Sequence, residues 1–140
     1  MISRTNSVSK IVKAVAQYQE EVVGFDPPDW LKNTDNVALV KGEDVSLFER
    51  QYALGSDVVC GHYFFFSRGK EACNTAKEML KEIFTGPYNV QRIVGLTPVD
   101  HRAALWMNRQ LGFKSYGQID TAAGPCEFVL LTKEEWENSQ

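Results

Sequence analysis

A long apolar run, Val58–Phe66, lies near the middle of the chain and limits what the chain can fold into. Turn-forming residues precede it at Gly55–Asp57, and an amphipathic segment, Lys70–Phe84, follows it. Its lack of polar alternation is typical of a central strand that is covered on both faces. The next strand is expected at Arg92–Leu96. A strand, a helix and a strand in succession predict one parallel pair with a right-handed crossover.

The other segments add helices and antiparallel strands around this unit. Apolar periodicity predicts a first helix over Val8–Val23, capped by Asn6 or Ser7 and ended by Gly24, with a loop at Phe25–Trp30. Thr97 is the expected cap of a later helix that starts at Pro98 and ends at Gly112. Further strands are expected at Val37–Val40, Val45–Glu49, Lys114–Ile119 and Cys126–Thr132. A last short helix is expected after Thr132. The chain is therefore expected to be an α/β (α+β type) protein with a mixed, mostly antiparallel sheet, helices on both faces, and a single domain over residues 1–140.

Composition excludes several classes of function. The chain has 140 residues, 44% of them hydrophobic, and a net charge of −3 without a cluster of basic residues. A broad nucleic-acid surface is therefore not expected. No apolar run reaches the roughly 18 residues that span a membrane, and no apolar secretory segment opens the sequence, so we expect a cytoplasmic protein. The three cysteines lack metal-ligand spacing and are expected to be reduced thiols, with no metal site.

Two stretches resemble the GNAT acyltransferase superfamily. TPVDHRAALWMNRQLGF, residues 97–113, ends in the Leu-Gly-Phe that closes the last main helix of that family, and a β hairpin follows it. GHYFFFSRGKEACNTAKEML, residues 61–80, resembles the family's core strand, phosphate turn and helix. Together the likeness covers roughly residues 58–132. Shorter stretches around Gly61–Phe64 and Gly95–Pro98 also resemble small GNAT-like proteins of tailed phages, some of them virion-associated.

The resemblance implies a binding site for acyl-CoA, with acetyl-CoA as the expected donor. In that fold the two central parallel strands splay apart, and the pantetheine arm lies along the strand edge, here Tyr63, Phe64 and Phe65. The pyrophosphate meets backbone N–H groups at the next helix N-terminus, here Arg68, Gly69 and Lys70, with Glu71 and Ala72 in the first helical turn. A plain strand-to-helix turn with solvated charges is the alternative interpretation. Phe64–Phe66 are likewise explained by simple core packing.

The candidate catalytic residues are His62 and Asn108. An imidazole on the central strand is suited to take the proton of an acceptor amine, although a hydrogen-bonded core histidine is the structural alternative. Asn108 falls where active relatives often carry a tyrosine acid, and an amide can donate a hydrogen bond but cannot deliver a proton. Glu71 stands where the family pattern has a small residue. Cys60 shares a strand face with His62, but such proximity alone is weak support for a nucleophile and its base.

These residues lead to two hypotheses of different class. The first is an acyl-CoA-dependent N-acyltransferase whose acceptor amine, on a protein or a small molecule, attacks the thioester directly. The second is a GNAT-like fold without activity that serves as a phage structural or protein-binding module, in the host cytoplasm or in the virion. The resemblance also allows a homodimer or contacts with virion proteins. The two hypotheses differ in whether the parallel strands open onto free N–H groups at residues 68–72.

Overall fold

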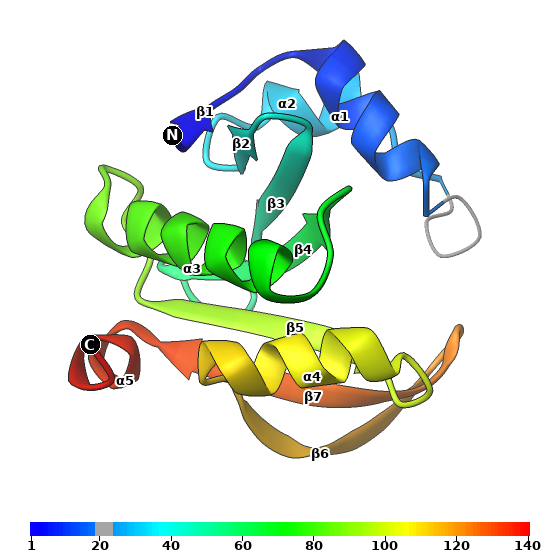
Figure 1. Ribbon diagram of the computed structural model, residues 1–140, viewed down its shortest axis with the longest axis vertical. Coiled ribbons are helices and arrows are strands. Elements are labelled where there is room, and N and C mark those ends of the chain that lie inside the picture. Colours follow the sequence, from blue (N-terminus) through cyan, green and yellow to red (C-terminus); the bar gives the residue numbers. More distant parts are fainter. Residues whose placement is uncertain (19–23) are drawn as a thin grey trace.

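The computed structural model describes residues 1–18 and 24–140 and shows one mixed sheet with helices on both sides (Figure 1). The strands are β1 Ser3–Arg4, β2 Val37–Lys41, β3 Asp44–Arg50, β4 Val58–Phe64, β5 Arg92–Pro98, β6 Lys114–Thr121 and β7 Gly124–Thr132. The helices are α1 Val8–Ala16, α2 Pro27–Lys32, α3 Gly69–Thr85, α4 Arg102–Leu111 and α5 Lys133–Asn138. No helix within the described ranges is both long and apolar enough to cross a membrane.

The sheet has the order β1-β2-β3-β4-β5-β7-β6. Among the strands of the described residues, β4 and β5 form the one parallel pair, and the other neighbouring strands are antiparallel. The helix α3 forms the connection between the parallel strands. These features confirm the predicted mixed sheet and its single β–α–β unit. The short β1 pairs with β2 at one edge of the sheet.

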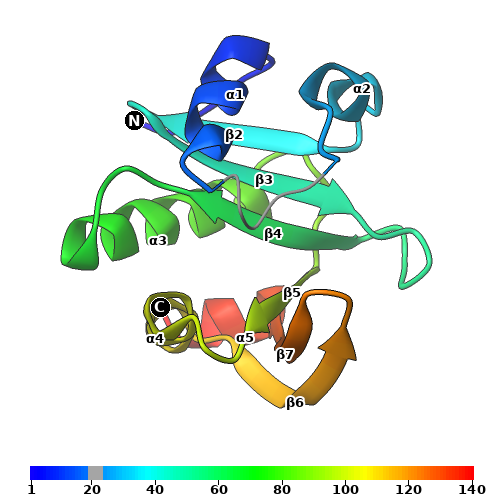
Figure 2. The same cartoon turned by 90° about the vertical axis from the view of Figure 1, so that its right-hand side faces the viewer.

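Side chains alternate between the two faces of the sheet and build two cores. On β2, Val37 and Leu39 belong to the core beneath α3, whereas Ala38 and Val40 belong to the core beneath α1 and α2. The first core extends from β2 to β7 and includes residues of β5, α4 and α5. The second takes its strand residues from β2, β3 and β4 alone. Figure 2 shows α1 and α2 near β2 and β3 and away from β5, β7 and β6.

Two helix boundaries differ from the predictions. α1 is capped by Ser7 as expected, but it ends at Ala16 and not at Gly24; residues 19–23 of the predicted helix lie outside the described residues. The predicted loop at Phe25–Trp30 contains most of α2, because the Asp26 side chain accepts a hydrogen bond from the Asp29 N–H and Pro27 takes the first helical position.

The start of α4 was also predicted wrongly. Thr97 and Pro98 are the last residues of β5, where they pair with Glu127 and Cys126 of β7. The cap of α4 is His101, whose Nδ1 accepts a hydrogen bond from the Ala104 N–H. The end of α4 was predicted correctly: Gly112 has a φ of 90°, which is the left-handed cap conformation.

A buried arginine joins three loops at one end of the sheet. Arg50, the last residue of β3, is 8% exposed. Its guanidinium donates to backbone carbonyls of four residues in three loops: Asp35, Ser56, Tyr88 and Asn89. A buried charge is tolerated when most of its donors are used in this way, because each hydrogen bond compensates part of the lost hydration.

We predict that Arg50→Lys lowers the free energy of unfolding by at least about 2 kcal/mol, because an ammonium cannot reach all of these carbonyls and leaves buried acceptors unpaired. Urea denaturation measures the change. The matched control is Arg92→Lys, since Arg92 makes a partly exposed ion pair with Asp57 and should change stability by less than about 1 kcal/mol. Equal losses in the two variants would contradict this role of Arg50.

Candidate functional site

The two parallel strands are paired over only part of their length. β4 and β5 pair at Val58–Arg92, Val59–Ile93 and Cys60–Val94. Beyond Cys60 and Val94 both strands continue, β4 to Phe64 and β5 to Pro98, but they no longer pair with each other. Figure 2 shows the two strands separating. The edge of β4 after Cys60 is therefore not hydrogen-bonded to β5, as the resemblance led us to expect for this pair.

The turn after β4 leads directly into α3. Gly69 is the first residue of the helix and has a φ of +59°, a conformation that favours glycine, and a side chain at this position would meet no atom within 4 Å. In the part of the chain that the structure describes, no side chain caps α3. The open space beside Gly69 thus allows another group to approach the backbone closely, and the helix dipole favours an anion at this end of α3.

The charged residues of this turn have separate roles. The Arg68 guanidinium folds back onto its own turn, where it donates to the carbonyls of Phe65 and Ser67 and to the Gln17 amide oxygen. It is therefore occupied with the backbone and does not extend toward an external anion. Lys70 is exposed in the first turn of α3 and is the cation that remains there. Ala72 is buried against the core.

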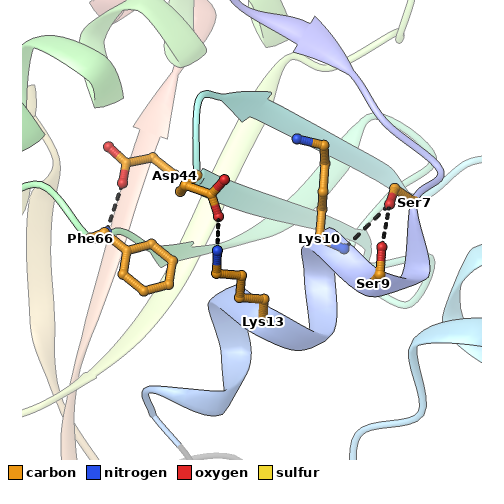
Figure 3. A network of polar contacts seen from close by, with 7 residues as sticks. Ser7, Ser9, Lys10, Lys13, Asp44 and Phe66 are labelled. Carbon is orange, nitrogen blue, oxygen red and sulfur yellow. Dashed lines mark hydrogen bonds and ion pairs between the residues drawn. The ribbon is translucent and has the colours of Figure 1, made fainter.

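Asp44 fixes the turn from the neighbouring strand (Figure 3). Its carboxylate accepts hydrogen bonds from the Phe66 N–H at 2.7 Å, the Ser67 N–H at 3.1 Å and the Ser67 hydroxyl. Asp44 is 7% exposed and is the first residue of β3. One buried carboxylate thus satisfies three donors, which holds the chain in place just before α3 begins.

Glu71 does not lie between the two parallel strands. It lines an open cavity of about 870 Å³ together with Glu78 and with residues 41–44 of the β2–β3 turn. In the strand order, β2 and β3 are on the opposite side of β4 from β5. Glu71, which stands where the family pattern has a small residue, therefore lines the cavity on the β2–β3 side of β4.

We predict that Asp44→Ala lowers the free energy of unfolding by about 2 kcal/mol and speeds amide hydrogen exchange at Phe66 and Ser67, because both N–H groups lose their acceptor. Asp44→Asn should cost less, since its amide oxygen still accepts. The control is Glu43→Ala, which removes only the exposed ion pair with Lys13 and should change stability by less than about 1 kcal/mol. Unchanged exchange at residues 66 and 67 would contradict the role of Asp44.

His62 lies on the face of β4 that also carries Cys60 and Phe64, the face of the core beneath α1 and α2. The ring is exposed and stacks on Phe64 at 6.4 Å between centroids, and it forms no hydrogen bond with the described residues. A buried, hydrogen-bonded core histidine is therefore not what the structure shows. Although the ring reaches solvent, the surrounding protein lowers its pKa, and the Glu49 carboxylate opposes this shift.

Cys60 is unsuited to be a nucleophile. Burial, followed by the nearby Glu49 charge, raises the pKa of its thiol to about 12. A thiol with this pKa is almost entirely protonated at neutral pH, and the thiolate is the reactive form. All three cysteines are free; Cys73 and Cys126 are buried, in agreement with the prediction of reduced thiols, and Cys60 is partly buried. Within the described residues, no group of three or more His, Cys, Asp or Glu is placed to hold a metal ion.

Asn108 lies on the opposite side of the sheet from His62. Its amide nitrogen donates to the Thr97 hydroxyl at 2.9 Å, which ties α4 to the part of β5 beyond the parallel pairing. Tyr63 points to the same side as α3, between Phe48 and Phe65. Its hydroxyl is buried without a hydrogen-bond partner among the described residues, and burial raises its pKa.

The aromatic run at the end of β4 has three different environments. Phe64 packs beneath α1 with Tyr18, and Phe65 packs beneath α3, so these two side chains fill the two cores. Phe66 is 42% exposed, which corrects the expectation that the whole run is covered on both faces. The Phe65 carbonyl is already used, since it accepts from the Tyr18 hydroxyl and from Arg68. The part of the β4 edge that faces β5 and is still available for hydrogen bonds is therefore the stretch between Cys60 and Phe64.

Sequence reasoning missed two residues of the site, Asp44 and Glu49. Asp44 came just before the predicted strand Val45–Glu49, and Glu49 was the last residue of that strand. Their importance depends on the register β3–β4, which places Glu49 opposite Cys60 and Asp44 beside the end of β4. A lone carboxylate at the start of a strand carries no sequence signal for this register.

We predict that the His62 pKa, followed by NMR, lies below the usual value of about 6.5. The protein packed around the ring disfavours the imidazolium even though the residue reaches solvent, so the ring should be mostly neutral at pH 7 and able to accept a proton. Glu49→Gln should lower this pKa further, because the carboxylate that favours the imidazolium is removed. The exposed Glu134→Gln is the control and should leave the His62 titration unchanged. An increase in the His62 pKa in Glu49→Gln would contradict the assignment.

The backbone is similar to those of several solved acetyltransferases. A chimera of the spermidine N-acetyltransferase SpeG from Vibrio cholerae matches with a TM-score of 0.75, 10% identity and 99% coverage of both chains. AAC(6')-Ib in a complex that contains acetyl-CoA matches with a TM-score of 0.72, 14% identity, and coverage of 100% of this chain and 97% of the other. The chain has the GNAT fold. Aminoglycoside 6'-acetyltransferase type Ii also matches, with a TM-score of 0.70 and 15% identity over 94% of this chain and 96% of that one.

Sequence comparison adds nothing to this structural likeness. No protein-family model matches the chain, and no curated protein sequence matches it significantly. At 10–15% identity the solved structures share the GNAT fold with this chain, and function has to be argued from the site itself.

Proposed function

We propose that the chain is an acyl-CoA-dependent N-acyltransferase, with acetyl-CoA as the donor. The observation that carries the proposal is the end of the β4–β5 ladder after Cys60 and Val94, next to the uncapped start of α3 at Gly69. The unpaired edge of β4 is suited to the amide groups of a pantetheine arm. The N–H groups and Lys70 at the start of α3 are suited to a pyrophosphate. Among the structural neighbours, AAC(6')-Ib was solved with acetyl-CoA.

The residues suggest direct transfer between two bound substrates. The acceptor nitrogen bonds to the thioester carbonyl carbon, the carbon–sulfur bond breaks, and the sulfur leaves with its electron pair as the thiolate of CoA. A backbone N–H of β4 polarises the carbonyl. His62 takes the proton from the acceptor nitrogen, either directly or through one water. A covalent route through Cys60 is disfavoured because its thiol stays protonated.

The two candidate catalytic residues fit the two sides of this reaction. His62 faces the α1 and α2 side of the sheet, and Asn108 lies with α4 on the other side. An acceptor amine that approaches on the α1 and α2 side would meet His62, and a CoA thiol that leaves on the α4 side would meet Asn108. Asn108 is bound to Thr97 and supplies a hydrogen bond at most, so the proposed enzyme depends mainly on holding its substrates close together.

We predict that acetyl-CoA binds with a micromolar Kd, about −8 kcal/mol, when titrated into the protein by calorimetry. Gly69→Trp should abolish the binding heat, because the indole fills the space beside the first N–H groups of α3. Gly117→Trp is the matched control, since Gly117 on β6 also has a positive φ and open space around it.

The control separates loss of the site from loss of the fold. Both substitutions place an indole at a positive φ with open space around it, so equal circular dichroism spectra with binding lost in Gly69→Trp alone would support the proposal. If the folded wild-type protein gives no heat up to millimolar acetyl-CoA, the enzyme proposal fails, and the protein-binding module becomes the better hypothesis.

A further inference from the structure

The open cavity beside α3 has a wall that no part of the proposed acyl-CoA site uses. It has a volume of about 870 Å³ and is lined by residues 41–44 of the β2–β3 turn, by the turn after β4 and by one face of α3. The α3 residues are Glu71, Asn74, Thr75 and Glu78, whose spacing of three or four makes them neighbours on a helix surface. Because β2 and β3 are on the other side of β4 from β5, the cavity lies away from the gap between the parallel strands.

The lining of this cavity carries an excess of negative charge. Four of its side chains are carboxylates, and two of these, Glu43 and Glu78, each pair with one lysine, at 2.7 and 2.9 Å. The other two, Asp44 and Glu71, form no ion pair with the described residues, although Asp44 accepts hydrogen bonds from the turn after β4. Two negative charges are therefore left without a cation, which favours a ligand with two positive charges.

A buried hydroxyl without a partner also lines the cavity. Thr75 is 3% exposed, and its hydroxyl makes no hydrogen bond with any residue in the described ranges. Buried hydroxyls usually have a partner, because an unpaired one has lost its hydrogen bonds to water and gained none in return. Glu71 precedes Thr75 by one helical turn, so their Cβ atoms are about 5–6 Å apart and both side chains can contact the same group.

An exposed aromatic ring forms another part of the wall. Phe66 is 42% exposed and lines the cavity, whereas Phe64 and Phe65 just before it are buried. The Asp44 carboxylate accepts from the Phe66 N–H at 2.7 Å and so fixes its backbone (Figure 3). The face of an aromatic ring attracts ammonium groups, and an apolar chain also packs well against it. A single metal ion fits this wall less well, since the described residues place no group of three or more His, Cys, Asp or Glu around one point.

We propose that this cavity binds a linear organic dication with primary ammonium groups. One ammonium donates hydrogen bonds to the Glu71 carboxylate and to the Thr75 hydroxyl, and the carbon chain beside it packs against the Phe66 ring. The second ammonium offsets the negative charge that remains on the lining. The inference goes beyond the proposed acyltransferase function and does not depend on it, because the ligand binds on the other side of β4 from the gap.

The test titrates the protein with 1,6-diaminohexane at low ionic strength, by calorimetry and by NMR of the backbone amides. We expect binding, with shifts concentrated at residues 41–44, 66–67 and 71–78. Glu71→Gln should weaken it by about tenfold, as expected when a hydrogen bond to a charged group is lost. Thr75→Val should also weaken it without lowering the free energy of unfolding, because the removed hydroxyl has no partner among the described residues. Hexylamine, with the same chain and one charge, should bind about fivefold more weakly.

Control measurements separate a site from general attraction to an acidic protein. Glu134→Gln removes an exposed carboxylate on α5, outside the cavity, and should leave the affinity for 1,6-diaminohexane unchanged. Circular dichroism checks that each variant is folded. The inference is wrong if millimolar diamine gives no heat and no shifts, if hexylamine binds equally well, or if Glu71→Gln and Glu134→Gln weaken binding by the same factor. None of these measurements uses acetyl-CoA, so their failure would leave the proposed function standing.

Discussion

The three-residue ladder between β4 and β5 is the constraint on which the rest of the structure depends. It joins β1–β4 to β5–β7, and beyond it the two halves are connected through the core beneath α3. Gly61 marks the point of divergence. A side chain there would come within 3.3 Å of Ile93 and 3.4 Å of Phe48. The strands can therefore approach at Gly61 and then separate, while large residues on either side remain packed.

Internal contacts organise the turn after β4, where the proposed anion site lies. Asp44 binds the two N–H groups before Arg68, and Arg68 binds the carbonyls around it, so the chain direction at Gly69 is set by internal contacts. The first N–H groups of α3 then need little reorganisation to meet a phosphate, and preorganised donors bind at a lower entropic cost. The two acids near the turn have different roles. The Asp44 carboxylate accepts hydrogen bonds from the turn, whereas Glu71 lines the cavity on the β2–β3 side.

Local patterns predicted the elements well where local forces decide them. The run at Val58–Phe66, the stripe of α3 and the Gly112 cap each depend on neighbours in sequence. Thr97-Pro98 has the sequence of a helix start, yet pairing with β7 keeps it in a strand, and proline is tolerated at this strand end. Asp44 and Glu49 were missed because their roles depend on the β3–β4 register, which periodicity does not specify.

The division of the site between two sheet faces bears on which step of the proposed transfer is slow. On the His62 side, the lowered pKa keeps the imidazole neutral and able to accept a proton, and the Glu49 carboxylate stabilises the imidazolium that then forms. On the Asn108 side, the amide is bound to Thr97, and the buried Tyr63 hydroxyl has a raised pKa, so neither is a good acid for the leaving thiolate. Departure of sulfur would then rely on hydrogen bonding and solvent. Nucleophilic attack would be better supported than leaving-group departure, and turnover would be limited by breakage of the carbon–sulfur bond.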